Sequence, residues 1–222
     1  YGRLGNQLFQ YAMLKAVSLE TGHELKIPNP RHMYWSGIKT QPCLLNQYNI
    51  ECDYLEESDL KKIKYNFTEK AHTYFNPQVF TVPDGTNFHG YFQNSQYFIK
   101  HANTIRKELT LKEELENSAQ EYIHSLKNNN EKIVSVHFRR GDSTDAARPT
   151  MVKDYYGRND KLTRESHFGS YFFRALKEFE GQNVKFLVFS GGTPKGMNHN
   201  QGDVDWCKEN LKDDRFIFCE GK

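Results

Sequence analysis

The sequence predicts an α/β protein with a parallel sheet in its C-terminal half. After residue 131, short apolar runs alternate with amphipathic stretches of helical spacing, as expected for parallel strands joined by helices. The first run is rich in β-branched residues and ends in charged ones, which is typical of a buried strand with a ligand site at its carboxyl end. The 222 residues, 37% of them hydrophobic and 14% aromatic, suffice for a substantial core.

The first predicted element is a helix that follows a glycine-rich turn. Its apolar face stops at Gly22 and consists of Leu8, Phe9, Ala12, Ala16 and Leu19. Gly2 and Gly5 let the backbone approach a ligand closely, and Asn6 can cap the helix. Because unpaired amide groups and the helix dipole favour negative charge, this end suits a pyrophosphate. The alternative is a plain turn and cap.

The next segment is predicted to contain short strands separated by irregular chain. In order, these are a strand at 23–27 that stops at Pro28, a loop at 29–54, a polar surface stretch at 61–70 and a strand at 87–93. Gly90 in the last strand leaves space for a close neighbour.

Residues 95–127 have a helical pattern with one break near Thr110. The second helix carries an apolar face formed by Leu115, Ala119, Tyr122, Ile123 and Leu126. The polar stretch at 128–130 then predicts a boundary between two domains, 1–130 and 131–222.

The second domain is predicted to alternate strands and helices. The strands are at 132–137, 185–190 and 215–219, and the helices at 166–179 and 204–212. Residues 143–165 form a polar loop without a regular period. Ser190 ends the second strand before Gly191 and Gly192, so two strand ends send loops toward one crevice, which could hold a nucleotide. The alternative for the two glycines is a flexible turn.

The charged cluster after the first strand of this domain is His-Phe-Arg-Arg-Gly-Asp at 137–142. Guanidinium groups hold phosphate through paired hydrogen bonds, so the arginines predict a phosphate ligand. Strand alternation places His137 with Arg139 and opposite Arg140, which favours Arg139 as the direct ligand. Asp142 either orients an arginine or faces the reacting centre. The alternative for the whole cluster is a surface network of ion pairs.

Composition narrows the classes of function. The 30 Lys+Arg and 28 Asp+Glu give a formal net charge of +2, too even for electrostatic capture of nucleic acid. The four cysteines lack zinc-site spacing, which predicts free thiols, with a Cys43–Cys52 bridge as the alternative. We expect no metal site, no membrane-spanning segment and no secretory leader. Because the first residue is Tyr1 and not Met, we expect a trimmed beginning.

Four motifs occur in an order that resembles a known enzyme family. They are Gly-Arg-Leu-Gly-Asn-Gln-Leu-Phe-Gln-Tyr-Ala at 2–12, Gly-Tyr-Phe-Gln at 90–93, His-Phe-Arg-Arg-Gly-Asp at 137–142, and Phe-Ser at 189–190 followed by Trp-Cys-Lys-Glu-Asn-Leu at 206–211. In this order and spacing they resemble the α-1,2-fucosyltransferases of glycosyltransferase family 11. The resemblance implies a GT-B-like fold of two Rossmann-like halves. It also implies inverting, metal-independent transfer of L-fucose from GDP-fucose to the 2-hydroxyl of a terminal galactose in an oligosaccharide or glycoconjugate.

The resemblance also implies roles for individual residues. Donor binding falls to Gly5, Asn6, His137, Arg139, Arg140 and Ser190, and catalysis to Arg139, Asp142 and Asn6. Arg139 is similar to the arginine that neutralises the donor pyrophosphate. Asp142 is the first candidate for the general base, with His23 and Glu24 as alternatives. No cofactor beyond the donor substrate is implied. Residues 1–130 would form the acceptor side and 131–222 the GDP-fucose side.

The sequence departs from the family pattern in three places. Ser143 replaces an aromatic residue, Gly191 and Gly192 replace an acidic pair, and the sequence ends before a Ser/Thr-Phe-Ser-Trp-Trp-like element. From the last departure we expect an incomplete C-terminal sheet. The alternatives are a catalytically inactive relative that binds nucleotide or glycan, and a fucosyltransferase of different linkage. We expect a cytoplasmic or membrane-peripheral location in a microbe or virus, and the Golgi lumen for a eukaryotic fragment.

Overall fold

The structure is a computed structural model that forms two compact units, Tyr1–Ala119 and Gln120–Lys222. It describes residues 2–29, 34–35, 38–39, 43–71, 73–127, 130–138, 161–190 and 201–219. The division between the units falls inside helix α4 (Glu113–Leu126), before the predicted boundary at residue 130. The acceptor and donor roles of the two halves stay predictions.

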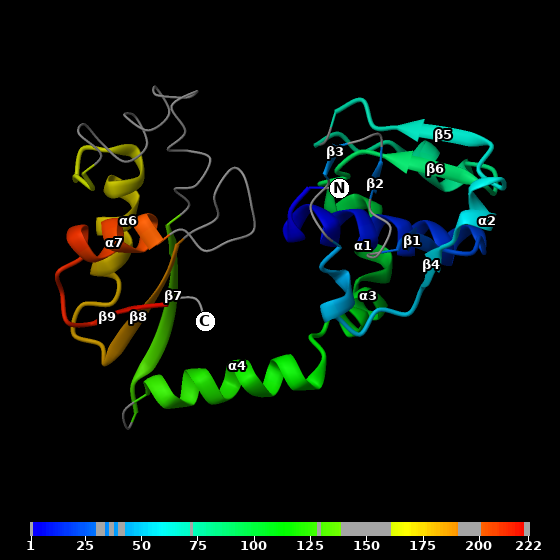
Figure 1. Cartoon of the computed structure of the whole chain (residues 1–222). Helices are drawn as coiled ribbons and strands as arrows, with labels where there is room; N and C mark the ends of the chain where they lie inside the picture. Colours follow the sequence, from blue (N-terminus) through cyan, green and yellow to red (C-terminus); the bar gives the residue numbers. More distant parts are fainter. Residues whose placement is uncertain are drawn as a thin grey trace. The chain divides into compact units, whose positions relative to one another are not determined.

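Helix α1 (Leu4–Thr21) runs through the centre of the first unit (Figure 1). It ends at Gly22, whose φ of 75° is left-handed and whose amide donates to the Ser18 carbonyl oxygen at 2.9 Å, so the predicted stop is confirmed. The predicted apolar face is wrong at Phe9 and Leu19, which are 36% and 44% exposed. The helix is packed on several sides, and its buried residues are Gln7, Tyr11, Ala12, Met13, Ala16 and Val17.

Three clusters of buried residues surround α1. The first contains Met13, Val17, Val79, Phe92 and Tyr97; the second Tyr11, Ile27, Cys43 and Leu45; and the third Ala12, Ala16 and Ile105. Because these clusters meet different sides of one helix, α1 holds most of the first unit together. A single amphipathic stripe describes a helix covered on one side only.

The strands of the first unit form small sheets of two strands each. They pair as β1 (Lys26–Pro28) with β4 (Asp53–Leu55) in parallel, β2 (Tyr34–Trp35) with β3 (Ile38–Lys39) antiparallel, and β5 (Tyr65–Thr68) with β6 (Thr86–His89) in parallel. The predicted loop at 29–54 is therefore wrong where β2, β3 and β4 form. The stretch at 61–70 is mostly exposed, as predicted, but it contains β5. The residues of β5 are mostly exposed, so no apolar alternation marked this strand.

The helical region before the second unit is confirmed, with its break at Thr110. Short helices α2 (Glu57–Leu60) and α3 (Ala102–Glu108) precede α4, and 3-10 turns lie at Leu45–Gln47, Pro77–Thr81, Ser95–Tyr97 and Ile99–His101. No residue of α4 is buried, and Leu115 and Tyr122 are 41% and 40% exposed. The apolar face predicted for α4 is therefore not part of either core.

The second unit contains a parallel sheet of the predicted kind. Strands β7 (Lys132–Phe138), β8 (Val184–Ser190) and β9 (Phe216–Phe218) pair in that order, all in parallel. Helices α6 (His167–Lys177) and α7 (Gln201–Asn210) cover one face (Figure 1), where their side chains join Phe138 and Val188 in one core. The prediction of a mixed α/β protein with parallel strands is confirmed.

Candidate functional site

The carboxyl ends of β7 and β8 lie side by side in the second unit. Phe138 pairs with Ser190 in the register, and Ser190 Oγ donates a hydrogen bond to the Phe138 carbonyl oxygen at 2.8 Å. The Phe138 ring is fully buried, with its centroid 5.2 Å from those of Phe168 and Phe172. Side chain and backbone are thus both held at the residue that immediately precedes Arg139.

The motif residues beyond this point lie outside the described residues. These are Arg139, Arg140 and Asp142, together with Gly191 and Gly192 of the neighbouring strand end. Their roles stay predictions.

His137 and Ser190, two predicted donor ligands, are described. His137 is exposed and, by strand alternation, lies on the face opposite to buried Phe138. The Ser190 hydroxyl joins the ends of β7 and β8 through its bond to Phe138. The sequence did not reveal this structural contact. Whether either side chain contacts a donor stays a prediction.

The glycine-rich turn at the start of α1 differs from the prediction in its cap. Arg3 occupies the N-cap position without a side-chain hydrogen bond, so the predicted capping by Asn6 is wrong. Asn6 lies within the first turn because Gly5 is already helical. Its Oδ1 accepts a hydrogen bond from Gln93 Nε2 at 2.8 Å. The first-turn amide groups still lack helical acceptors, as at any helix start.

The two glycines of this turn serve different purposes. Gly2 has a φ of 80°, and a Cβ there would lie 2.4 Å from Asn6 Nδ2. A Cβ at Gly5 would meet no described atom within 4 Å. Gly2 is therefore required by its backbone and by the Asn6 side chain, whereas internal packing among the described residues does not require Gly5.

Gln7 is a buried polar residue beside the glycine turn that the apolar pattern did not reveal. It is buried, its Nε2 donates to the Gly2 carbonyl oxygen at 2.9 Å, and its Oε1 accepts from the Leu44 amide at 2.9 Å. These bonds fix the glycine turn to a segment 37 residues away. In the sequence Gln7 is an amide residue one turn before Tyr11 on the buried side of the helix, so the apolar pattern gave no sign of its burial.

Residues 90–93, predicted as a strand, form a tight turn after β6. The Glu69 carboxylate accepts hydrogen bonds from the amides of Tyr91 at 2.7 Å and of Phe92 at 3.0 Å. A Cβ on Gly90 would lie 2.4 Å from Glu69 Cβ, so Glu69 is the close neighbour that Gly90 admits. The turn carries Gln93 to Asn6, so the structure joins the motifs at 2–12 and 90–93.

A buried polar network lies further along α1. The Tyr11 hydroxyl donates to the Glu108 carboxylate, and Lys15 Nζ lies 2.6 Å from Glu108 Oε1. Burial and the Glu108 carboxylate raise the pKa of Tyr11, and burial raises the pKa of the Cys52 thiol to about 11. All four cysteines are free, so the predicted thiols are confirmed. At neutral pH Cys52 is protonated and therefore a poor nucleophile.

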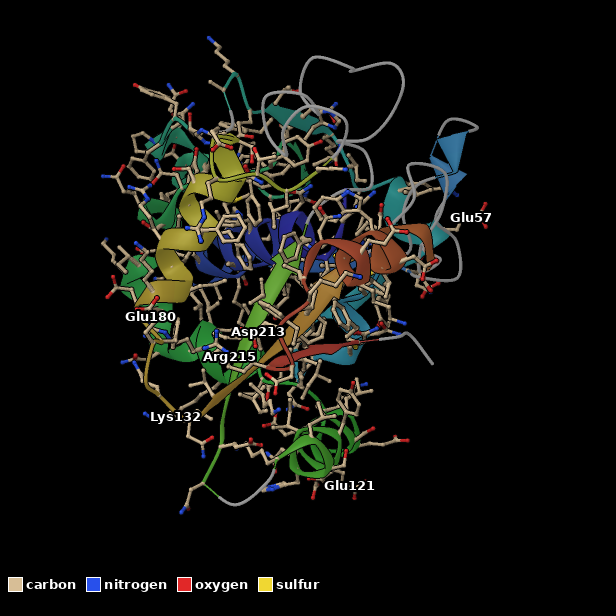
Figure 2. All side chains as sticks on the ribbon, turned by 90° about the vertical axis from the view of Figure 1, so that its left-hand side faces the viewer. Glu57, Glu121, Lys132, Glu180, Asp213 and Arg215 are labelled. Atoms are coloured by element: carbon tan, nitrogen blue, oxygen red, sulfur yellow. The ribbon has the colours of Figure 1, made fainter. Side chains whose placement is uncertain are left out.

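A cavity of about 280 Å³ lies elsewhere in the second unit, between the ends of α6 and α7 and the start of β9. Figure 2 shows Asp213 and Arg215 beside each other where β9 begins. Arg215 Nη2 lies 2.7 Å from Asp213 Oδ2, and this ion pair lowers the pKa of Asp213 to about 2. The cavity is near the start of a strand, whereas the arginine motif follows the end of one, so it is not the candidate site.

Two further features are absent from the described ranges, a metal-binding cluster and a helix able to span a membrane. No group of three or more His, Cys, Asp or Glu residues there could hold a metal ion. None of the helices in that part of the chain is both long and apolar enough to cross a membrane.

Comparison with known proteins shows which family this sequence belongs to. The family model of Glycosyl transferase family 11 matches residues 1–221. The protein is 26% identical over 228 residues to an alpha-1,2-colitosyltransferase of Escherichia coli, a match that covers 94% of this chain and 69% of the relative. No solved structure is significantly similar. Because the family model extends from the glycine turn before α1 past the last strand β9, the chain belongs to glycosyltransferase family 11.

Proposed function

We propose that the protein is an inverting α-1,2-glycosyltransferase that transfers L-fucose from GDP-fucose to the 2-hydroxyl of a terminal galactose in a glycan. Membership of glycosyltransferase family 11 supports the reaction class. The observation that carries the donor site is the fixed pair of strand ends at Phe138 and Ser190, from which the arginine motif follows. Ligands of open α/β sheets bind at this edge. A GT-B-like arrangement of the two units is part of the proposal.

In the proposed reaction, Arg139 neutralises the charge that develops on the departing GDP. The bond between the fucosyl carbon and the β-phosphate oxygen breaks while the acceptor oxygen attacks from the opposite face. A guanidinium fixed before the reaction stabilises the charged transition state more than the ground state, which lowers the barrier. Arg140, His137 and Ser190 support the donor. Two cationic side chains supply the charge that a metal supplies in other transferases, so the proposal needs no metal.

Asn6 and Gly5 are the proposed contribution of the first unit. The exposed backbone of Gly5 and the first-turn amides of α1 offer hydrogen-bond donors to an oxygen-rich ligand. The Asn6 side chain adds an amide donor. Their assignment to the donor substrate rests on the resemblance of the motif at 2–12.

Asp142 is the proposed general base that accepts the proton of the acceptor hydroxyl. The alternatives His23 and Glu24 follow the far end of α1, about 27 Å from its first turn at 1.5 Å per residue over 18 residues. Glu24 also lies 3.6 Å from Lys26 Nζ, an ion pair on the surface. If Asn6 lies at the reaction centre, His23 and Glu24 are too far from it to act as the general base.

A second candidate donor is the GDP derivative of colitose. The observation that favours it is the name of the relative, an alpha-1,2-colitosyltransferase. Colitose is L-fucose without its 3-hydroxyl, so the bond made and broken is the same. A site that hydrogen-bonds this hydroxyl discriminates strongly against the sugar that lacks it.

The test is transfer by the full-length protein from GDP-fucose and from GDP-colitose to a panel of galactosides, followed by NMR of the product linkage. We expect acceptor-dependent GDP release and a product linked to the 2-hydroxyl of galactose, with fucose preferred. A preference for GDP-colitose would overturn the proposal that GDP-fucose is the donor. A product with another linkage would overturn the proposal that the 2-hydroxyl of galactose is the acceptor. GDP binding without transfer to any acceptor would contradict an active enzyme.

A further inference from the structure

We propose that Glu69 is a positioning residue that acts through Gln93 to hold the Asn6 amide in its working orientation. The inference rests on the proposed function, because it assigns a purpose to a contact beside Asn6. It concerns three side chains from separate parts of the first unit: the end of β5, the turn after β6 and the first turn of α1.

The first step is the closure of the 90–93 turn by the Glu69 carboxylate. Its two oxygens accept the Tyr91 amide at 2.7 Å and the Phe92 amide at 3.0 and 3.1 Å, while the Glu69 amide donates to the His89 carbonyl oxygen at 2.8 Å. Hydrogen bonds to a carboxylate are stronger than those between neutral groups. Glu69 therefore binds the turn through its side chain at Tyr91 and Phe92 and through its backbone at His89.

The second step is the unusual backbone of Phe92. Its φ of 52° is left-handed, a conformation that a bulky residue rarely adopts without support from its surroundings. The Phe92 ring is buried, with its centroid 5.7 Å from that of Tyr97. The carboxylate of Glu69 and this packing together impose the conformation, which directs the next residue, Gln93, toward α1.

The third step is the orientation of Asn6. Gln93 Nε2 donates to Asn6 Oδ1, so the amide of Asn6 is held by its oxygen and its Nδ2 lies on the other side. A Cβ at Gly2 would collide with that Nδ2 at 2.4 Å, so the glycine leaves it room. With its oxygen bound to Gln93, Asn6 has Nδ2 as its hydrogen-bond donor. A donor is the group that suits the oxygen atoms of a sugar or a phosphate.

If Glu69 only stabilised the fold, its hydrogen bonds would be explained, but the placement of Gln93 against Asn6 by a left-handed backbone at Phe92 would not. The two explanations differ in one measurable consequence. If Glu69 acts through Gln93, removing either residue has the same effect on turnover, and removing both adds little.

The kinetic test compares Glu69→Gln, Gln93→Ala and the double variant in the full-length protein with its best donor and acceptor. Glutamine keeps one acceptor oxygen but replaces the other with an amide donor. We expect about 10- to 100-fold lower kcat for each single variant, with a smaller change in KM, because a displaced catalytic group costs rate of this order. The double variant is expected within threefold of the worse single variant.

Two control variants separate positioning from stability. Glu57, an exposed carboxylate of the same unit labelled in Figure 2, makes Glu57→Gln the matched chemical change. Tyr97→Phe keeps the ring that packs against Phe92 and removes only the hydroxyl, which accepts from the Asn76 amide and donates to the Tyr74 carbonyl oxygen. It therefore lowers thermal stability without changing the Phe92 packing or the Asn6–Gln93 pair. Both are expected to keep wild-type kcat. Loss of kcat in Tyr97→Phe in proportion to its stability, or additive effects of Glu69→Gln and Gln93→Ala, would overturn the proposal.

A second measurement does not need activity. In ¹⁵N-labelled protein, the side-chain amide signals of Asn6 and Gln93 are expected to shift in Glu69→Gln and to stay in place in Glu57→Gln. Unchanged signals in Glu69→Gln would overturn the positioning role even in an active enzyme. Absence of transfer by the wild type would overturn the proposed function alone, since the amide signals would still decide whether Glu69 orients the pair.

Discussion

Two side chains, Phe138 and Ser190, hold the backbone where the arginine motif begins. Phe138 contributes a fully buried ring that contacts α6 and α7. The Ser190 hydroxyl on β8 donates a hydrogen bond to the Phe138 carbonyl oxygen on β7. Truncation of a buried phenylalanine typically costs about 3–5 kcal/mol of stability. The described chain is therefore fixed up to the residue before Arg139, and groups fixed before the substrate arrives are the ones that serve electrostatic catalysis.

The first prediction concerns Arg139. We expect Arg139→Ala to lower kcat/KM by about 10²–10³, the usual loss when one fixed donor to a developing charge is removed. The measurement is GDP release in the presence of a galactoside. Arg174→Ala serves as the control, because Arg174 is exposed on α6, where its Nε donates to the Ser170 carbonyl oxygen of the same helix at 3.2 Å. Normal turnover by Arg139→Ala would remove this residue from the mechanism.

At the scale of elements, α1 combines a structural and a proposed functional end. Its C-terminal half lies in the core around Met13 and Val17, whereas its first turn carries Gly5 and Asn6 and follows the turn that contains Gly2. The helix is therefore positioned by burial at residues that have no part in the chemistry.

The second prediction compares the two glycines of this turn. Gly5→Ala is expected to raise stability by up to about 1 kcal/mol, because alanine is the better helix former and its Cβ meets no described atom. If the donor approaches this backbone, the same variant raises KM for the donor. Gly2→Ala is expected to lower both stability and kcat, because its Cβ collides with Asn6 Nδ2. Thermal unfolding and donor titration measure both effects, and an unchanged donor KM in Gly5→Ala would argue against donor contact there.

The third prediction concerns the junction between β1 and α2. Asp59 accepts hydrogen bonds from Lys62 at 2.8 Å, from Lys26 at 3.0 Å and from the Glu56 amide at 3.1 Å, and these lower its pKa well below the ordinary 3.8. A lowered carboxyl pKa stabilises the folded state fully above pH 3.8, and this stabilisation is lost as the pH falls toward the folded-state pKa.

Asp59→Asn should therefore unfold at a lower temperature than wild type at pH 7. The difference should shrink as the pH is lowered below 4. Melting curves from pH 7 to pH 2 measure it, with Asp53→Asn, an exposed carboxyl on β4, as the control. A difference that is independent of pH would show that the charge of Asp59 is not what stabilises the junction.

At the scale of the whole molecule, each unit has its own core. The clusters around α1 belong to the first unit, and the cluster of Phe138, Phe172 and Trp206 belongs to the second. Units of this kind can unfold in separate steps, and a ligand that binds one of them raises the stability of that unit.

The fourth prediction uses the two tryptophans. In a Trp35→Phe variant, fluorescence reports Trp206 alone, which is 7% exposed in the core beneath the arginine strand. GDP at 100 times its Kd is expected to stabilise this unit by about 2.7 kcal/mol. A rise of the Trp206 melting temperature with GDP concentration would support nucleotide binding by Gln120–Lys222, and no rise at saturating GDP would contradict it.

The predictions from sequence succeeded where one local pattern carried the structure. The alternation of apolar runs and helical stretches after residue 131 predicted the parallel order of β7, β8 and β9, because each element there buries a regular face. The stop at Gly22 was also predicted, since a left-handed helix end favours glycine. Neither prediction needed knowledge of distant residues.

The sequence by itself determined the α/β class, the strand that ends at the arginine motif and, through four ordered motifs, the family. Only the tertiary structure decided that α1 is buried on several sides, that the Glu69 carboxylate binds the amides of the 90–93 turn, and that Gln93 hydrogen-bonds Asn6. The physical reason is distance along the chain. Gln93 and Asn6 are 87 residues apart, and a hydrogen bond between them leaves no periodic trace in the sequence.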